Sequence, residues 1–303
     1  MKGIILAGGN GTRLYPVTKS VSKHLLHVYD KPMIYYPLSI LFMAKIQEIL
    51  IICTPHHVAQ YRGLLGDGSQ WGASISYAIQ YRPDGLGSAF ILGEQFIGSD
   101  SVCLILGDNI FHGQGLIDLL MQAREDLAGG SIFCSYVKDP YRYGVVDFDE
   151  QHRICRIIEK PKTFVSNYAV TGLYFYENDV IEIAKNICLS ARGELEISDI
   201  NNQYLQQKRL KATMLSRGFA WFDVGTHQSL LDASQYIALL EERQSLKVGC
   251  VEEIAWRHGF IDAAQVAQLA QSLSHVDYGQ YLLQILKECQ NPLYADDGME
   301  FVV

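Results

Sequence analysis

The sequence lacks the cysteine pattern of secreted or zinc-stapled proteins. Its seven cysteines are odd in number and widely spaced, and no two of them form a CxxC pair. This spacing argues against a disulfide framework and against a cysteine zinc site, so we expect buried thiols in a reducing compartment. The cysteines are Cys53, Cys103, Cys134, Cys155, Cys188, Cys250 and Cys289.

Long hydrophobic runs and an excess of positive charge are also missing. No uninterrupted apolar stretch reaches membrane-spanning length, and no basic segment followed by an apolar one opens the chain, so we expect a cytoplasmic protein without a signal peptide. Acidic residues (33) outnumber basic ones (25), which gives a formal net charge of −8. Such a chain is a poor candidate for binding nucleic acid or anionic membranes, although a few cations in one pocket can still hold a small polyanion.

The chain does contain enough apolar sequence for a large core, since 49% of its 303 residues are hydrophobic. In the first half, apolar runs alternate with helical patterns, which indicates parallel strands joined by crossover helices. We expect strands at 3–7, 48–53, 74–79 and 101–106, and helices at 33–45, 56–65 and 86–96. The first helix would carry its apolar residues on one face: Ile34, Leu38, Leu41 and Phe42.

The rhythm changes after about residue 130, where several strands follow one another directly. They are expected at 131–137, 144–148, 153–158 and 169–176, followed by helices near 178–189 and 198–207, a strand near 211–215 and an apolar run at 219–223. The sheet is therefore expected to become mixed here. From residue 226 onward the pattern is helical, with helices at 227–244, 261–272 and 277–289. Such a tail serves assembly or regulation, or it simply packs on its own core.

A glycine loop follows the first apolar run. Gly8, Gly9 and Gly11 allow backbone N–H groups to turn inward and hold phosphate oxygens. The loop is no P-loop, because no lysine follows the glycines, and no dinucleotide-binding fingerprint, because position 14 is leucine. Arg13 and Lys23 are two cations that could clamp a triphosphate beside this loop. The alternative is a tight turn without a ligand and two solvated side chains.

Several longer blocks carry a resemblance to a known family. The chain has GGNGTRL at 8–14, SKHLL at 22–26 and YDKPMIYYPL at 29–38, and further blocks at 65–72, 106–111, 166–176 and 193–197. With these blocks it resembles the sugar-phosphate nucleotidyltransferases, in particular the glucose-1-phosphate thymidylyltransferases, over nearly its whole length. Together the blocks are highly specific, whereas the glycine loop alone is not.

The resemblance implies a fold and a division of the chain. The fold would be α/β, with a Rossmann-like, mixed but mostly parallel sheet covered by helices on both faces and a C-terminal helical extension. A catalytic domain would span 1–240, with a nucleotide-binding part at about 1–130 and a sugar-binding part at about 131–225. Residues 241–303 would form the helical extension for assembly or regulation, and the family suggests a homotetramer.

The resemblance also implies a reaction. The phosphate of glucose 1-phosphate would attack the α-phosphorus of dTTP, giving dTDP-glucose and pyrophosphate, with Mg²⁺ as cofactor, as a first step toward dTDP-rhamnose or other dTDP-deoxysugars. No covalent enzyme intermediate is needed, because the nucleophile is already an anionic oxygen. Catalysis would consist mostly of positioning and charge neutralisation.

Two aspartates are the expected metal ligands. Asp108 follows the apolar strand at 102–106, and Asp223 ends the apolar run 219–222. Ligands bind at the carboxyl ends of strands in an open sheet, and two carboxylates with phosphate oxygens suit Mg²⁺. The alternative for each aspartate is a turn or a helix cap.

The remaining site residues follow from the resemblance. The expected catalytic residues are Arg13, Lys23 and Lys160. The expected nucleotide site contains Leu6, Gly8, Gly9, Gly11, Thr12, Gln80, Pro83, Gly85 and Asp108. The expected sugar site contains Leu86, Asn109, Tyr143, Gly144, Glu159, Lys160 and Val170. A second, regulatory nucleotide site for the feedback ligand dTDP-rhamnose would contain Gly113, Arg217, Gly218, Glu253, Ile254 and Arg257.

Gln80 is the expected reader of the base, because a glutamine amide offers a donor and an acceptor to a pyrimidine edge. Thymine differs from uracil by one methyl group, which is worth only about 1–3 kcal/mol in a pocket. We therefore expect UTP or dUTP to be used at a reduced rate.

The chain departs from the family pattern at a few positions. The usual SKQLLP is SKHLLH here, with His24 and His27; their i, i+3 spacing could suggest a metal, but no third ligand lies nearby in sequence. The usual DGLAQAF is DGLGSAF, which introduces Gly87 and Ser88. The usual DNIFYGH is DNIFHGQ.

Other functions are weighed against this one. A uridylyltransferase, or a thymidylyltransferase for another hexose 1-phosphate, is the close alternative. A non-catalytic regulatory protein of the same fold would be expected to lose the arginine, a lysine or an aspartate, and all are present here. A nicotinamide-dependent oxidoreductase is disfavoured by Leu14.

Overall fold

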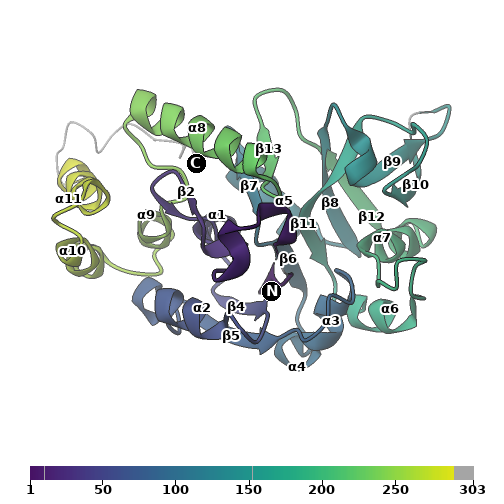
Figure 1. The fold of residues 1–303 in the computed structure, drawn as a ribbon, viewed down its shortest axis with the longest axis horizontal. Helices are drawn as coiled ribbons and strands as arrows, with labels where there is room; N and C mark the ends of the chain where they lie inside the picture. Colours follow the sequence, from purple (N-terminus) through teal and green to yellow (C-terminus); the bar gives the residue numbers. More distant parts are fainter. Residues whose placement is uncertain (10, 152, 290–303) are drawn as a thin grey trace.

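The structure is a computed structural model that describes residues 1–9, 11–151 and 153–289. A central β-sheet is covered by helices on both faces, and the last helices stack at one end (Figure 1). Among the described residues the main sheet contains nine strands. Their order is β10 (Ile154–Glu159), β9 (Gly144–Phe148), β11 (Tyr168–Tyr176), β6 (Val102–Leu106), β1 (Lys2–Ala7), β4 (Glu48–Cys53) and β5 (Ser74–Ile79), with β8 (Gly130–Tyr136) pairing both β11 and β12 (Leu210–Met214).

The sheet is parallel on one side and mixed on the other, where β12 pairs in parallel with β8. β1 pairs in parallel with β4 and β6, and β4 pairs in parallel with β5. β11 pairs antiparallel with β6, β8 and β9, so strand direction reverses there. The predicted α/β fold, with a parallel first half and a mixed sheet after about residue 130, is confirmed.

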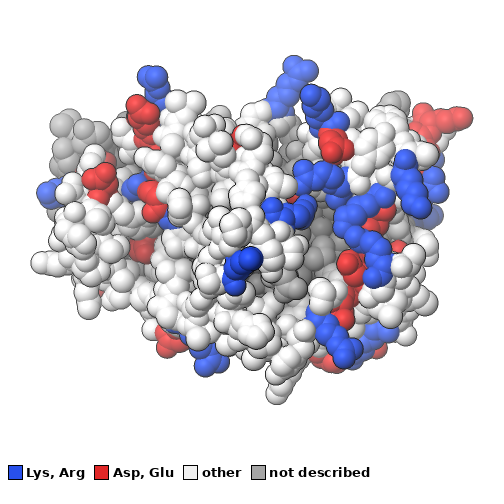
Figure 2. All heavy atoms as spheres, viewed as in Figure 1, with Lys and Arg blue, Asp and Glu red and all other residues white. Residues whose placement is uncertain are grey.

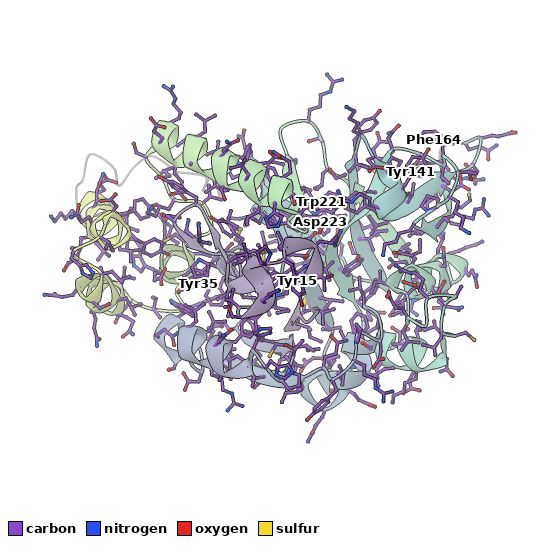
Figure 3. The ribbon with its side chains drawn as sticks, viewed as in Figure 1. Tyr15, Tyr35, Tyr141, Phe164, Trp221 and Asp223 are labelled. Carbon is purple, nitrogen blue, oxygen red and sulfur yellow. The ribbon has the colours of Figure 1, made fainter. Side chains whose placement is uncertain are left out.

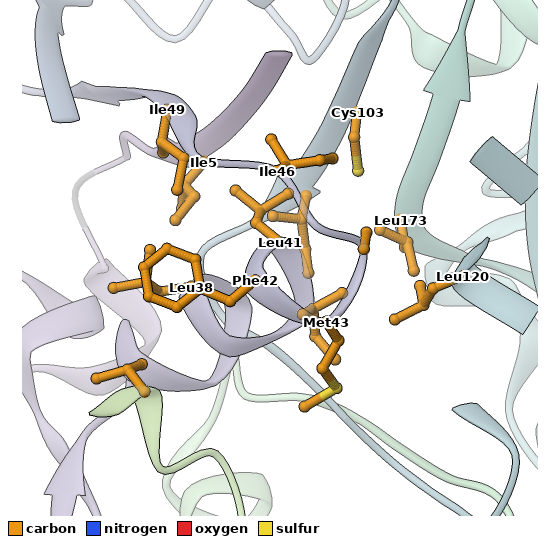
Figure 4. Close-up of a cluster of buried hydrophobic side chains, with 14 of the residues drawn as sticks. Ile5, Leu38, Leu41, Phe42, Met43, Ile46, Ile49, Cys103, Leu120 and Leu173 are labelled. Atoms are coloured by element: carbon orange, nitrogen blue, oxygen red, sulfur yellow. The ribbon is translucent and has the colours of Figure 1, made fainter. Parts of the chain in front are cut away.

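The buried strands supply two hydrophobic cores, one on each face of the sheet. Successive side chains of a strand point to opposite faces. Ile5, Ile49 and Ile105 therefore belong to one core, and Ile4 and Leu104 belong to the other. This explains why the parallel strands are apolar throughout, as expected for a sheet with both faces covered. Figure 4 shows the first core, where α1 (Tyr35–Met43) packs on the sheet.

α1 differs from the helix predicted over 33–45 with one apolar face. It begins at Tyr35 and ends at Met43, and every residue from Tyr36 to Met43 is buried. The prediction of a single apolar face was wrong because α9 (Val251–Arg257), more than 200 residues later, covers the side that local sequence would leave to solvent. The helix ends before Lys45, which adopts a left-handed conformation with φ of 54°.

Other helices depart from the predicted pattern in two places. The single helix predicted over 86–96 is two short helices, because Gly93 separates them where the chain packs on Ile4. α5 (Leu116–Glu125) and α9 were not predicted as separate helices. The helices of this part are α2 (Val58–Leu65), α3 (Ser88–Leu92), α4 (Glu94–Ile97), α5 (Leu116–Glu125), α6 (Val180–Asn186) and α7 (Ile197–Gln206). Short 3₁₀ turns lie at Thr12–Leu14, Val17–Lys19, Lys23–Leu25, Ser69–Trp71 and Pro140–Arg142.

Two small ribbons lie outside the main sheet. β7 (Asn109–His112), which was not predicted, pairs antiparallel with β13 (Ala220–Asp223), and Asp223 lies opposite Asn109. This pairing brings the two predicted metal ligands to neighbouring positions, because Asp108 directly precedes β7. The second ribbon joins β2 (His27–Val28) to β3 (Lys31–Pro32).

The C-terminal part contains α8 (His227–Gln244), α9, α10 (Ala263–Ser272) and α11 (Asp277–Cys289). A buried charge network ties α8 to the ribbon of β2 and β3. Lys31, which is 2% exposed, lies between Asp30 and Glu241, and Lys247 contacts the same two carboxylates. The domain boundary predicted at residue 240 stays a prediction.

The cysteines are only partly as predicted. Cys53, Cys103, Cys134 and Cys250 are buried, whereas Cys155, Cys188 and Cys289 are exposed. The exposed ones lie on a strand edge, in a loop and at a helix end, where neighbouring apolar sequence does not decide burial.

In the ranges described above, the structure contains no helix with the length and hydrophobicity needed to cross a membrane.

Candidate active site

A cleft of about 520 Å³ opens at the carboxyl ends of β1 and β6. Leu6 and Leu106 from these strands line it, together with Asp108 just beyond β6. Carboxyl ends of parallel strands are where open α/β sheets bind ligands. Lys and Arg side chains gather on the right half of the face in Figure 2, on the side of the molecule that carries β9 and β10. The cleft is therefore the candidate active site.

Most of the predicted site residues meet in this cleft. The predicted residues that line it are Leu6, Gly8, Gly9, Arg13, Lys23, Gln80, Pro83, Gly85, Leu86, Asp108, Asn109, Tyr143, Gly144, Glu159, Lys160, Val170 and Asp223. Gly11 and Thr12 are not among its lining residues, and neither are the six residues of the predicted regulatory site. The structure brings the residues together, while the individual roles stay predictions.

Two glycines of the glycine loop differ in their surroundings: Gly9 is open and Gly11 is closely packed. Gly9 has φ of +94° and no atom within 4 Å of the position that a Cβ would take. Gly11 has φ of +58°, and a Cβ there would lie 3.3 Å from the Thr18 side chain and 3.4 Å from Lys23 Cβ. Thr18 Oγ1 also donates to the Gly11 carbonyl at 2.7 Å. Gly11 therefore supports the loop beside Lys23, while Gly9 leaves its backbone accessible.

Each of the two aspartates faces a cation. Lys23 forms an ion pair with Asp108. Arg142 Nη2 lies 3.5 Å from Asp223 Oδ2. Figure 3 shows Asp223 on β13 in the middle of the view. The guanidinium of Arg13 packs on the turn just after Asp223, because a Cβ on Gly225 would lie 3.0 Å from Arg13 Nη2.

The two carboxylates are close enough to influence one another. Burial and the Asp108 carboxylate raise the pKa of Asp223 above its ordinary value, against the opposing effects of Lys23, Arg13 and Arg142. Burial alone would raise the pKa of Asp108 too, but Lys23 and the Asn109 amide outweigh it, and the pKa of Asp108 is lowered. Opposite shifts of this kind are typical of like charges that share one site.

This donor set fits a hard divalent cation. Two carboxylates supply the oxygen ligands that Mg²⁺ prefers, and an added cation would relieve the repulsion that raises the pKa of Asp223. In the described part of the chain no group of three or more His, Cys, Asp or Glu side chains could hold a metal by itself. Further ligands would have to come from phosphate oxygens or water.

Asn109 was predicted to contact the sugar, and its amide is already engaged within the protein. Its Nδ2 donates to Asp108 Oδ1 at 3.0 Å. Its Oδ1 accepts from Trp221 Nε1 at 2.6 Å and from the Gly172 backbone at 3.1 Å. These bonds fix the orientation of the Asp108 carboxylate.

The far side of the cleft carries Glu159 and Lys160. Ser198 Oγ donates to Glu159 Oε2 at 2.6 Å. A Cβ on Gly144 would lie 2.9 Å from Ser198 Oγ and 3.2 Å from Glu159 Oε2, so only glycine leaves room for this carboxylate. Lys160 has φ of 42°, a rare conformation for a residue with a side chain, and such strain clusters at functional sites.

Several polar residues that line the cleft were missed at the sequence level, and Arg192 and Ser198 are two of them. Arg192 Nη2 lies 3.5 Å from Glu159 Oε1 and makes two bonds with Glu196 carboxylate oxygens at 2.7 and 2.8 Å. Ser198 holds Glu159, and both residues line the cleft. They flank the block at 193–197, and that adjacency was the only local signal for either residue.

The segment predicted to bind the base, residues 83–88, is joined through backbone hydrogen bonds to the loop that precedes Ser198. The Leu195 N–H donates to the Asp84 carbonyl at 2.8 Å, and the Gly87 N–H donates to the Leu195 carbonyl at 2.9 Å. Gly85, with φ of +94°, could not carry a Cβ, which would lie 2.5 Å from the Leu195 oxygen. The two halves of the cleft therefore share one structural connection.

The two unusual histidines do not form a metal site. His24 is buried, and its Nδ1 lies 3.0 Å from the Tyr61 hydroxyl and 3.2 Å from Ser22 Oγ. Burial lowers the pKa of His24 to about 3, so the ring is neutral. His27 lies exposed on β2. His24 is thus a packed, hydrogen-bonded residue at the cleft wall next to Lys23.

The residues of the predicted regulatory site lie in two groups. Glu253 Oε1 accepts from Arg257 Nε at 2.8 Å on α9. Gly113 packs on the ring of Phe219, and a Cβ on Gly113 would lie 2.4 Å from that ring. Phe219 directly follows Arg217 and Gly218 in the sequence, so these three predicted residues lie near one another.

Comparison with known proteins places this cleft in a family. A family model described as nucleotidyl transferase matches residues 2–239. A glucose-1-phosphate thymidylyltransferase from Neisseria meningitidis is 54% identical over 288 residues, covering 95% of this chain and 100% of that protein. One of the same name from Mycobacterium tuberculosis is 54% identical over 287 residues, covering 95% and 99%.

Solved structures agree in fold. A Bacillus anthracis protein, provisionally designated a glucose-1-phosphate thymidylyltransferase and crystallised with sucrose, has a TM-score of 0.72 and 42% identity, covering 78% of this chain and 94% of its own. A UDP-glucose pyrophosphorylase with bound UDP-glucose has a TM-score of 0.68 and 24% identity, covering 80% of this chain and 99% of its own, which supports the fold alone. The chain therefore belongs to the nucleotidyl transferase family.

Proposed function

We propose that this chain is a glucose-1-phosphate thymidylyltransferase, which condenses dTTP with glucose 1-phosphate to dTDP-glucose and pyrophosphate. Relatives of that name share 54% of its residues over 95% of its length. The observation that carries the proposal is the arrangement of the cleft. One end holds the glycine loop, Arg13 and Lys23, and the other holds Glu159 and Lys160.

The geometry suits an in-line phosphoryl transfer. Lys160 and Arg192 bind the phosphate of the sugar, whose oxygen forms a bond to the α-phosphorus of dTTP. The bond from that phosphorus to the bridging oxygen breaks, and pyrophosphate leaves. Arg13 and Lys23 lie beside the glycine loop and neutralise the charge that builds up on the phosphates. Bringing two anions together is thus a task of positioning and electrostatics.

Asp108 and Asp223 would hold Mg²⁺ in this site. Mg²⁺ held there would supply Lewis-acid stabilisation of the charge on phosphate oxygens. Lys23 and Arg142 hold the two carboxylates in place from the protein side. Asn109 orients Asp108 through its amide N–H.

One assay tests the function. Pyrophosphate release from dTTP and glucose 1-phosphate is measured with and without Mg²⁺, for the wild type and for Arg13→Ala. We expect turnover that needs Mg²⁺ and a large loss of kcat in a variant that stays folded by circular dichroism. Arg62→Ala, which changes an arginine of α2 outside the cleft, serves as the control and should keep wild-type turnover. An unchanged kcat in Arg13→Ala contradicts the role of Arg13, and no turnover in the wild type contradicts the function.

We also propose the finer properties that the resemblance implies. These are a cytoplasmic homotetramer, a role on the way to dTDP-rhamnose, and feedback inhibition at Gly113, Arg217, Gly218, Glu253, Ile254 and Arg257. The position of these residues outside the active-site cleft supports a separate site. Initial rates that do not respond to dTDP-rhamnose contradict the feedback, and a sedimentation mass other than that of four chains contradicts the tetramer.

A further inference from the structure

Ser88 lies behind the cleft at the start of α3 and does not line it. It is 6% exposed, and the neighbouring Gln80, which does line the cleft, is 7% exposed. Ser88 Oγ donates to the Gly85 carbonyl at 2.6 Å, and Gln80 Nε2 donates to Ser88 Oγ at 3.0 Å. The serine thus connects the predicted base reader to the backbone of the base-binding segment.

The direction of these two bonds follows from counting protons. A carbonyl oxygen can only accept a hydrogen bond, so the single hydroxyl proton of Ser88 is committed to Gly85. Ser88 then presents only lone pairs to Gln80, and the side chain of Gln80 must meet it with the NH₂ end of its amide. The opposite orientation would place two acceptors 3.0 Å apart in a buried site, which is costly.

The other end of the amide is therefore an acceptor at the cleft wall. Gln80 Oε1 lies against the glycine loop, since a Cβ on Gly8 would be 2.4 Å from it. Gly8 and Gly85 both line the cleft beside Gln80. A fixed acceptor there favours a base edge that carries an N–H, as thymine and uracil do at N3, over cytosine, whose N3 is itself an acceptor.

We propose that Ser88 is a positioning residue that sets base choice by holding the Gln80 amide with its oxygen toward the nucleotide. This proposal rests on the proposed function, because it takes the cleft to bind a pyrimidine nucleotide. Without the hydroxyl, either end of the amide can face the base, and the preference for an N3–H donor is reduced. The family that this chain resembles usually has glutamine at position 88, in DGLAQAF. The hydrogen bond from Gln80 to a serine hydroxyl is therefore a feature of this chain's own DGLGSAF sequence.

The test measures binding rather than turnover, so that it is independent of the chemistry. Calorimetric titration gives the Kd of dTTP and of dCTP for the wild type and for Ser88→Ala, without sugar phosphate. We expect Ser88→Ala to reduce the dCTP-to-dTTP ratio of Kd by about tenfold, the size of one lost hydrogen-bond preference. Ser88→Thr, which keeps the hydroxyl, should keep the ratio within about twofold.

A double-mutant cycle separates positioning from a general structural effect. If Ser88 acts through Gln80, then adding Ser88→Ala to Gln80→Ala should leave the ratio unchanged. Should Ser88→Ala unfold, Ser88→Cys takes its place with the same expectation, because a thiol is a weak hydrogen-bonding partner.

Three results would overturn the proposal. The first is an equal loss of affinity for both nucleotides in Ser88→Ala. The second is a fall of the ratio that persists in the Gln80→Ala background. The third is a wild type that binds neither nucleotide, which overturns the proposed function as well. A wild type that binds both but transfers nothing to glucose 1-phosphate contradicts the proposed function alone.

Discussion

Replacing Glu241 by alanine should destabilise the protein by about 3 kcal/mol, the lower end of the range for a broken buried ion pair. Glu241 Oε1 accepts from Lys31 Nζ at 2.9 Å and from the Val248 backbone at 3.0 Å, and Oε2 accepts from Lys247 Nζ at 3.1 Å. The residue is 8% exposed, so water cannot take over these bonds.

The magnitude follows from what the change leaves behind. Lys31 would stay buried at 2% exposure with Asp30 as its remaining carboxylate. Breaking one partner of a buried pair costs about 3–5 kcal/mol, and a buried backbone N–H left unpaired costs about 1–3 kcal/mol. The two terms do not add fully, because Asp30 still compensates both lysines. A loss of about 3 kcal/mol corresponds to about 6–12 °C in Tm for a protein somewhat smaller than this one.

The assay is thermal and urea unfolding at neutral pH and fixed protein concentration. Glu242→Ala is the matched control, because Glu242 is the next residue of α8 and is exposed. It should change the free energy of unfolding by no more than about 0.5 kcal/mol. If Glu241→Ala falls within about 1 kcal/mol of this control, the network does not stabilise the fold as argued.

Three further outcomes are expected. dUTP should be used with a kcat/KM about 10–200-fold below that of dTTP, the range for one methyl group, and UTP, which also carries a 2′-hydroxyl, should be used at a reduced rate; no UTP turnover at millimolar concentration would contradict this view of the base pocket. His24→Gln should make the free energy of unfolding less sensitive to acid. The pKa of His24 is lowered from 6.5 to about 3 in the folded protein, so the unfolded chain takes up a proton first as pH falls. The stability linked to His24 is therefore complete above pH 6.5 and is lost as pH falls toward 3. The variant should lack about 1.4 kcal/mol per pH unit of that slope in urea unfolding, while exposed His27→Gln should keep it, and equal slopes for the two variants would refute the assignment. Gly144→Ala should raise the KM for glucose 1-phosphate more than that for dTTP, because the added Cβ lies 2.9 Å from Ser198 Oγ and 3.2 Å from Glu159 Oε2; equal effects on both constants would count against a sugar-side role.

The parallel half of the fold could be predicted closely from the sequence. The strands predicted at 3–7, 48–53, 74–79 and 101–106 match β1, β4, β5 and β6 to within one residue. Strands buried on both faces are apolar throughout and are bounded by polar turns, so the local sequence indicates where they begin and end.

Elements that depend on distant partners could not be predicted in the same way. α1 is buried all round only because α9 covers it, and no local pattern in α1 contains that information. β7 forms a strand because β13, about 110 residues later, pairs with it. A four-residue strand after a turn gives too little periodicity to be recognised alone.

The candidate site likewise contains residues that local sequence motifs predict and residues that only the tertiary structure reveals. The glycine loop, Lys23, Asp108 and Lys160 lie in recognisable blocks, and the structure brings them into one cleft. Arg192 and Ser198 reach the cleft only because the loop before α7 and the first turn of that helix fold back onto Glu159. Their contribution is tertiary, and a single sequence does not display it.

The backbone link at Leu195 has a consequence for protein engineering. Because Leu195 bonds to Asp84 and Gly87 at once, the segments 83–88 and 190–198 behave as one cassette. Grafting a foreign loop at 83–88 alone into this scaffold would clash wherever it brings a side chain to position 85, because a Cβ there would lie 2.5 Å from the Leu195 carbonyl oxygen. Chimeras that exchange both segments together keep these backbone hydrogen bonds, so we expect base and sugar preferences to be transferred as a pair.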